Sequence, residues 1–117
     1  DMVPFWDLEF TDGDDQPRDS SSASIAACGM LEMIKSLDGE EKALYKKYAM
    51  QLMKALFDNY AVKDPSISNG LVLHSTYSNR SPYNTCNHYG VDECNSWGDY
   101  FYMEAMTRLQ KDWKLYW

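Results

Sequence analysis

The hydrophobic and polar positions form three helix-like stretches and two irregular segments. The first stretch begins after Asp19 and runs to about Leu37, and past Ser24 it is apolar on nearly every side. Asp19 or one of the three serines after it can accept hydrogen bonds from the unpaired amides of a first helical turn. Its apolar stripes are Ala26, Met30, Met33 and Leu37, with Ala27, Leu31 and Ile34 beside them. A helix this apolar is buried on most sides, so it is predicted to be an inner helix.

The second stretch follows an Asp38-Gly39 break and covers residues 40–59. Apolar residues recur on one face at helical spacing, and lysines occupy much of the rest. The apolar face comprises Tyr45, Tyr48, Ala49, Leu52 and Leu56. An inner helix joined by a tight turn to an outer, half-wet helix is an αα-hairpin.

The third stretch starts near Trp97. Ser96 followed three residues later by Asp99 resembles a capping box, and Asp99 is interpreted as the acid of a first helical turn. The predicted packing stripe comprises Gly98, Phe101, Tyr102, Ala105, Leu109 and Trp113. The chain ends in Tyr116 and Trp117, so we expect its aromatic end to be docked.

The two irregular segments differ in character. Residues 1–18 combine prolines, a glycine and many acids with four large apolar residues, which predicts an extended acidic segment pinned to an apolar surface. Residues 61–95 form a long connection in which residues 71–73 could be extended. A connection of this length within a compact domain is either functional or a sign that an element has been wrongly assigned, and its many hydrogen-bonding and stacking side chains favour a function.

Composition and charge narrow the partners. The 117 residues suffice for one domain, yet three helices do not enclose the inner one. The sequence therefore predicts that the chain is part of a larger helical assembly, whose core is completed by more chain or by another copy. Its net charge is −7, and residues 1–20 hold seven acids and one base, which is −6 of that total. The near-neutral remainder argues against a nucleic-acid or anionic-membrane surface, and no apolar run is long enough to span a membrane.

Candidate chemistry gathers in residues 74–99. Cys86, His88 and Cys94 lack the paired spacing of a structural zinc site, so we predict no metal, and no phosphate or dinucleotide motif implies another cofactor. Reduced thiols are favoured over a Cys86–Cys94 disulfide. Adjacent Asp92 and Glu93 could share acid–base work, but loop acids that bind backbone amides are favoured.

Aromatic residues on or beside this polar loop suit a sugar site, since ring faces pack on the apolar face of a pyranose. They are Tyr77, Tyr83, Tyr89 and Trp97. The same residues could equally fasten the loop to its scaffold. His74 could orient a ligand or be a structural histidine.

Three strings carry a family resemblance: residues 19–32, residues 69–77 and residues 92–105. They resemble the C-terminal part of the unsaturated glucuronyl hydrolases, glycoside hydrolase family 88, and the likeness covers essentially the whole chain. It implies an all-α fold, the C-terminal fragment of an (α/α)6 toroid with about three helices and a long ordered loop. That toroid would supply the missing neighbours of the inner helix.

The resemblance also implies an activity. Family members remove 4,5-unsaturated uronic acid from oligosaccharides of the glycosaminoglycan type by hydrating the double bond, with an aspartate as acid and base and without a metal. Their catalytic aspartates lie in the N-terminal part of the barrel, so no catalytic residue is expected here and the chain alone should be inactive.

The loop that would border the pocket supplies the expected sugar contacts, with Tyr77 as the stacking residue. The expected substrate-binding residues are His74, Tyr77, Ser78, Arg80, Ser81 and Trp97. A branch of the family that accepts sulfated substrates has a lysine at the position of Tyr83, so a sulfate site would depend on Arg80 instead.

Two other functions remain open at this stage. One is a non-catalytic helical module that binds carbohydrate or protein, and the other is an unsaturated rhamnogalacturonyl hydrolase, which shares the toroid. The expected partners are an unsaturated uronic-acid oligosaccharide and either the rest of the barrel or a second copy. By resemblance, the location would be the cytoplasm or periplasm of a bacterium.

Overall fold

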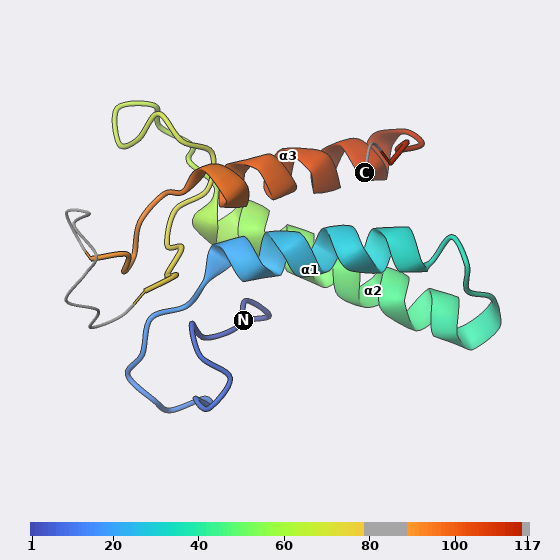
Figure 1. Cartoon of the computed structure of the whole chain (residues 1–117), viewed down its shortest axis with the longest axis horizontal. Coiled ribbons are helices and arrows are strands. Elements are labelled where there is room, and N and C mark those ends of the chain that lie inside the picture. Colours follow the sequence, from blue (N-terminus) through green and yellow to red (C-terminus); the bar gives the residue numbers. More distant parts are fainter. Residues whose placement is uncertain (79–88, 116–117) are drawn as a thin grey trace.

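The computed structural model describes residues 1–78 and 89–115. Its helical elements are α1 (Ser20–Met33), α2 (Gly39–Ala55), the π-helical turn η1 (Leu56–Tyr60) and α3 (Ser96–Gln110). Helix α1 packs against both α2 and α3. In Figure 1, α1 and α3 run in the same direction while α2 returns beside them. Helix α1 is therefore the inner helix of the predicted hairpin, and α3 lies parallel to it.

Helix α1 begins as predicted but ends earlier. Asp19 is its N-cap, and the carboxylate accepts hydrogen bonds from the amides of Ser21 and Ser22 at 3.0 and 3.2 Å. The helix ends at Met33 rather than near Leu37, because the amides of Lys35 and Ser36 bond three residues back instead of four. The stripe that packs is the one through Ala27 and Leu31, since Met33 is 39% exposed.

Helix α2 and η1 together span the second predicted stretch. Ala49, Leu52 and Leu56 are buried as predicted, whereas Tyr48 is exposed. The amide of Ala61 bonds to the carbonyl of Leu56 at 2.8 Å, five residues back. This wider last turn directs the chain out of the helix toward the loop.

The cap of α3 differs from the prediction. Asn95 is the N-cap, and its side-chain oxygen accepts from the amide of Gly98 at 2.7 Å. Ser96 is already helical, so the capping-box prediction is wrong. Asp99 is unavailable for such a box because its carboxylate accepts from the amides of Leu71 and Val72 at 3.0 and 2.9 Å.

The packing face of α3 is partly as predicted. Gly98, Tyr102 and Ala105 are buried, but Leu109 is 37% exposed. Glu104 is buried instead, at 3% exposure. It is tolerated because the Nε and Nη2 atoms of Arg108 bind its carboxylate at 2.8 and 2.7 Å.

The buried ion pair also links α3 to α1. Arg108 has only 5% of its side chain exposed, and its third nitrogen binds Glu32 of α1. Beyond α3, Trp113 lies over the Arg108 guanidinium at 5.5 Å and its carbonyl accepts from Lys35 at 3.1 Å. This part of the predicted aromatic end is docked, and residues 116 and 117 lie outside the described residues.

Residues 1–18 form an irregular loop that folds back on itself, where an extended segment was predicted. Phe5 and Arg18 pair as an isolated antiparallel bridge, and the Arg18 guanidinium lies 3.9 Å from the centre of the Phe5 ring. Val3 is fully buried, whereas Leu8 is 95% exposed. The segment is thus pinned at Val3 and Phe5 rather than along its whole length.

The described parts of the long connection are held by two isolated bridges. Ala61 pairs with Val72, and Ser75 pairs with Glu93 through two backbone bonds of 2.8 Å. The extended character predicted for residues 71–73 is confirmed. Between the end of η1 and the start of α3, the bridged parts of the connection pass beside the start of α1 (Figure 1).

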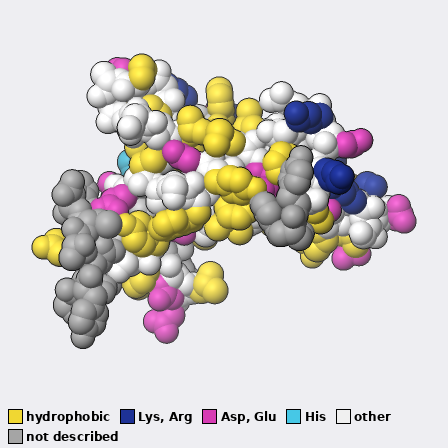
Figure 2. All heavy atoms as spheres, turned by 45° about the horizontal axis from the view of Figure 1, so that its top comes forward, with side chains coloured by type: hydrophobic (Ala, Val, Ile, Leu, Met, Phe, Trp, Pro, Cys, Tyr) yellow, Lys and Arg dark blue, Asp and Glu magenta, His cyan; other side chains and the backbone are white. Residues whose placement is uncertain are grey.

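Large apolar side chains remain exposed on the helices. Figure 2 shows hydrophobic side chains gathered across the middle of one face. Those on the helical elements with more than a third of their surface exposed are Ile25, Met33, Leu44, Tyr48, Met50, Phe57, Trp97, Tyr100, Met103 and Leu109. Such a surface is unusual for a protein with nothing packed against it. Among the described residues, no helix has the length and apolar character needed to cross a membrane.

Candidate functional site

Tyr77 and Trp97 form a perpendicular ring pair beside the starts of the two parallel helices. Their ring centres lie 5.0 Å apart at an interplanar angle of 77°. The rings come from the long connection and from the first turn of α3, and they are 38% and 40% exposed. Aromatic rings favour this edge-to-face arrangement. It leaves part of each ring accessible.

The phenol of Tyr77 is tied to the same loop. Its hydroxyl donates to Glu93 Oε2 at 2.8 Å, and the amides of Tyr77 and Ser78 both point at the carbonyl of Gly90, at 2.9 and 3.3 Å. Glu93 is itself fixed through its backbone bridge to Ser75. The Tyr77 ring is thereby held at its polar end and at its backbone.

The indole of Trp97 is tied to α1. Its Nε1 donates to Ser21 Oγ at 3.2 Å, and Ser21 Oγ donates in turn to Asp19 Oδ1 at 2.7 Å. The same carboxylate oxygen accepts from the amide of Thr76 at 3.2 Å, one residue before Tyr77. The Asp19 carboxylate thus connects the start of α1 to both rings.

His74 lies in a different part of the loop and pairs with Asp92. The two side chains meet at 2.5 Å between Nδ1 and Oδ1, and the His74 ring stands edge-on to Tyr60 at 5.7 Å. Both paired residues have left-handed backbones, with φ of 64° for His74 and 57° for Asp92. Such conformations cost free energy in residues other than glycine, so the pair fixes a turn that the surrounding contacts must stabilise.

A hollow of about 300 Å³ adjoins this pair. Its lining residues are Arg18, Asn59, Tyr60, His74 and Asp92. Burial raises the pKa of the Tyr60 phenol, so that group stays a hydroxyl and donates to Asp1 at 2.8 Å. Among the predicted sugar contacts in the described residues, His74 alone lines this hollow, and it lies apart from the Tyr77–Trp97 pair.

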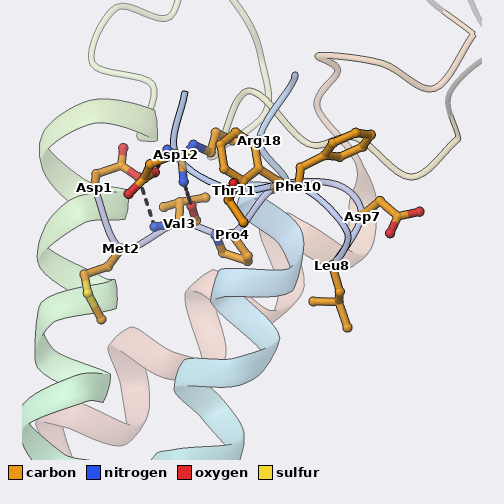
Figure 3. A pocket seen from close by; sticks show the side chains of 11 residues that line it. Asp1, Met2, Val3, Pro4, Asp7, Leu8, Phe10, Thr11, Asp12 and Arg18 are labelled. Carbon is orange, nitrogen blue, oxygen red and sulfur yellow. Dashed lines mark hydrogen bonds and ion pairs between the residues drawn. The ribbon is translucent and has the colours of Figure 1, made fainter. Parts of the chain in front are cut away.

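The N-terminal segment encloses a second hollow of about 410 Å³ (Figure 3). Arg18 reaches across it and donates to the carbonyl of Val3 at 2.7 Å, while Asp7 and Leu8 point outward. Arg18 also pairs with Asp12 at 3.2 Å. Through these contacts the Arg18 guanidinium stabilises the loop of residues 1–18.

Ser78 is the one remaining predicted sugar contact within the described residues. Ser78 is half-buried beside Tyr77, whereas Arg80 and Ser81 lie outside the described residues, as do Tyr83 and the possible metal ligands Cys86 and His88. In the part of the chain that the structure describes, no three His, Cys, Asp or Glu side chains gather as metal ligands would.

The acids near the loop have structural partners. Asp92 binds the His74 ring and Glu93 binds the Tyr77 hydroxyl, so the adjacent carboxylates point at different groups. The partners that the structure describes for these carboxylates are side chains, where backbone amides were expected. Burial raises the pKa of the neighbouring Cys94 thiol, and the negative charge of Asp99 raises it further.

Two residues central to this arrangement were missed from the sequence as parts of the site. Asp19 was expected only as a helix cap, and Ser21 only as one of several candidate caps. The signal that could have revealed them is the run of serines at a helix start, which places more hydroxyl groups there than capping requires.

Sequence comparison finds relatives over the full chain. An unsaturated chondroitin disaccharide hydrolase of Streptococcus pyogenes is 44% identical over 119 residues, which is 100% of this chain and 28% of the relative. One from Streptococcus agalactiae is 46% identical over 120 residues with the same coverage. An unsaturated glucuronyl hydrolase of a Bacillus species is 34% identical over 119 residues. This chain is related to the unsaturated glucuronyl hydrolases. No family model matches it.

Solved structures of unsaturated glucuronyl hydrolases show the same arrangement of helices. A variant of the Streptococcus agalactiae enzyme matches with a TM-score of 0.87 and 43% identity, over 100% of this chain and 32% of that one. A second variant of that enzyme, in complex with dGlcA-GalNAc6S, matches with a TM-score of 0.86. The chain therefore has the fold of part of an α/α toroid. It spans about 28% of the length of its first relatives, which is consistent with the predicted C-terminal portion.

Proposed function

We propose that this chain forms one wall of the substrate pocket in an unsaturated glucuronyl hydrolase that acts on glycosaminoglycan-type oligosaccharides. The observation that carries the proposal is the Tyr77–Trp97 pair, two accessible rings whose polar atoms are both already bonded within the chain. Rings held in this way offer their faces to the apolar side of a sugar. Two of its relatives are unsaturated chondroitin disaccharide hydrolases, which supports this class of ligand.

In this proposal the chain binds and orients substrate, and the chemistry is supplied from elsewhere. An aspartate outside these residues would protonate the double bond of the terminal uronic acid and activate the water that adds to it. Tyr77 would stack on the sugar that leaves, with Trp97, Ser78 and the loop residues Arg80 and Ser81 beside it. His74 would act through the loop, because it pairs with Asp92 at a separate hollow.

The exposed apolar helix faces suggest what completes the pocket. The large side chains exposed on all three helices would be covered by the remaining helices of the toroid, or by a second copy if the chain stands alone. A location in the bacterial cytoplasm or periplasm, where lyase products arrive, is part of the same proposal.

The proposal is tested by grafting this chain in place of the matching portion of its Streptococcus agalactiae relative. The 46% identity over the whole chain makes the exchange conservative. We expect the graft to consume an unsaturated chondroitin disaccharide, followed as loss of the ultraviolet absorbance of the double bond, and the isolated chain to consume none. A graft that melts cooperatively but turns over nothing would contradict the proposal, and so would robust turnover by the isolated chain.

An unsaturated rhamnogalacturonyl disaccharide serves as the second substrate in the same assay. Faster turnover of that compound by the graft than by the unmodified relative would favour the rhamnogalacturonyl function over the glucuronyl one.

A further inference from the structure

Trp97 is 40% exposed, and the N–H group of its indole bonds to the protein. The indole Nε1 donates to Ser21 Oγ, and Ser21 is only 2% exposed. A bond to a buried partner on another helix fixes the plane of the ring relative to α1. An exposed tryptophan without this bond could turn about two side-chain torsions.

The direction of the Ser21 hydroxyl is set by Asp19. A serine hydroxyl has one proton to donate and two lone pairs to accept with. Its proton goes to Asp19 Oδ1 at 2.7 Å, which leaves a lone pair for the indole of Trp97. The Asp19 carboxylate sits at the N-terminus of α1, where the helix dipole favours a negative charge. It therefore keeps the hydroxyl aimed in the direction that Trp97 requires.

The same carboxylate reaches the second ring through the backbone. Asp19 Oδ1 accepts from the amide of Thr76, and the next residue is Tyr77. This bond holds the strand-like turn against the start of α1, so the Tyr77 backbone and the Trp97 ring share one anchor. A single carboxylate thus controls the relative placement of two rings 5.0 Å apart.

Close approach of the two helices makes this geometry possible. A Cβ on Gly98 would lie 3.2 Å from Ser21 Cβ and 2.8 Å from the Asn95 side-chain oxygen. Only a residue without a side chain lets the first turn of α3 come this near to the first turn of α1. The indole then reaches the serine directly.

We infer that Ser21 and Asp19 are positioning residues, which hold Trp97 and the approach to Tyr77 in the orientation that receives the sugar. The effect on sugar binding depends on the proposed function. The placement of the rings depends only on the hydrogen bonds described above. Neither residue touches the sugar in this account, so each acts through a ring.

The first test is spectroscopic and uses the grafted enzyme, in which the helices of this chain have their neighbours; the loss of a signal in Trp97→Phe assigns the indole proton. Ser21→Ala should move the indole Nε1 proton signal of Trp97 and speed its exchange with solvent roughly 3- to 10-fold, the factor expected for one lost hydrogen bond. Asp19→Asn should move both this signal and the Thr76 amide, whereas Ser21→Ala should leave the Thr76 amide nearly in place. The matched control is Ser24→Ala, because Ser24 is equally buried and, within residues 1–78 and 89–115, its hydroxyl bonds only to the carbonyl of Ser20.

The second test is kinetic and uses the complete enzyme obtained by grafting this chain into its Streptococcus agalactiae relative. Ser21→Ala should raise KM for the unsaturated disaccharide roughly 3- to 10-fold with little change in kcat, since a misplaced ring weakens binding and leaves the acid–base groups alone. Ser24→Ala should change neither constant.

The two tests separate the outcomes. An indole signal that stays in place in Ser21→Ala, or moves as far in Ser24→Ala, would overturn the inference. An equal fall in kcat and kcat/KM would overturn it as well, because the residues would then act on the transition state. A complete enzyme without turnover would contradict the proposed function, while the spectroscopic test would still decide the positioning role.

Discussion

Arg108 provides the most quantitative prediction about the scaffold. Its guanidinium binds Glu104 within α3 and Glu32 across the interface with α1, and only 5% of the side chain is exposed. Arg108→Met keeps most of the apolar length of the side chain and removes the charge. Glu104, which is 3% exposed, then faces the helix interface with no cation.

The size of the loss follows from burial. Removing one partner of a buried ion pair leaves an uncompensated charge and typically costs about 3–5 kcal/mol. Glu32 adds little to this, because it is more exposed and retains Lys35 at 2.7 Å. We therefore expect Arg108→Met to lower the free energy of unfolding by about 3–5 kcal/mol, measured by urea titration of the helical circular dichroism. The double variant Arg108→Met with Glu104→Gln should recover much of the loss, since no buried charge remains.

Lys54→Met supplies the matched control. Lys54 pairs with Asp58 at the same i,i+4 spacing, but 75% of its side chain is exposed. An exposed pair of this kind contributes about 0.2–1 kcal/mol. If Arg108→Met costs no more than Lys54→Met, or if the double variant is as unstable as the single one, the reasoning from burial is refuted.

Three further predictions concern single residues. Asp19→Ala should lower the free energy of unfolding by about 1–2 kcal/mol in urea titration, and Asp38→Ala by much less, because Asp38 makes no capping bond through its side chain; equal losses would contradict the cap geometry. Gly70→Ala should cost about 1–3 kcal/mol in the same assay, because its Cβ would lie 1.9 Å from Cys94 Sγ; an unchanged midpoint would show that the contact is not as tight. Burial raises the pKa of Cys28 from 9.0 to about 12, so the free energy of unfolding should fall as pH rises above about 9 toward about 12, because the unfolded chain releases this proton first. Cys28→Ala should have a shallower slope, because burial also raises the pKa of Cys94 and of Tyr60 and these groups still contribute; a slope as steep as in the unmodified protein would contradict the assignment.

The sequence predicts the helices well where their apolar pattern is strong. The spacing of Ala49, Leu52 and Leu56 predicts the buried face of α2 and η1, and with it the pairing of an inner with an outer helix. The end of α1 was misplaced because a hydrophobic stripe continues through Leu37 after the backbone has already tightened into a turn. Hydrophobic periodicity does not register that change in hydrogen bonding.

The pattern of hydrophobic and polar residues could not predict which polar groups are buried. Glu104 is a polar residue on every hydropathy scale, and its burial is explained by its contact with Arg108, which also binds Glu32. The cap of α3 was misassigned for a similar reason, since Asp99 is used by the amides of a segment about 27 residues earlier. Such pairings join distant parts of the chain, so they depend on the fold rather than on local spacing.

The candidate site was predictable in part. The aromatic character of the loop and the resemblance together identified Tyr77 and Trp97, and the structure brings these two together. His74 was grouped with them because it is close in sequence, but its left-handed backbone turns it toward Asp92 and a separate hollow. The links from Asp19 and Ser21 to the rings depend on the packing of α1 against α3, which a single sequence does not specify.

The most direct measurement of the central claim is the KM of the grafted Streptococcus agalactiae enzyme for an unsaturated chondroitin disaccharide, with and without Tyr77→Ala. If the Tyr77 ring stacks on the sugar, its loss should raise KM roughly 3- to 10-fold, the factor set by an aromatic contact of about 0.5–1.5 kcal/mol. Phe57→Ala, which removes a ring 55% exposed on the outer helical layer, should leave KM unchanged. A KM that Tyr77→Ala leaves at the unmodified value, in a graft that melts at the same temperature, would contradict the account.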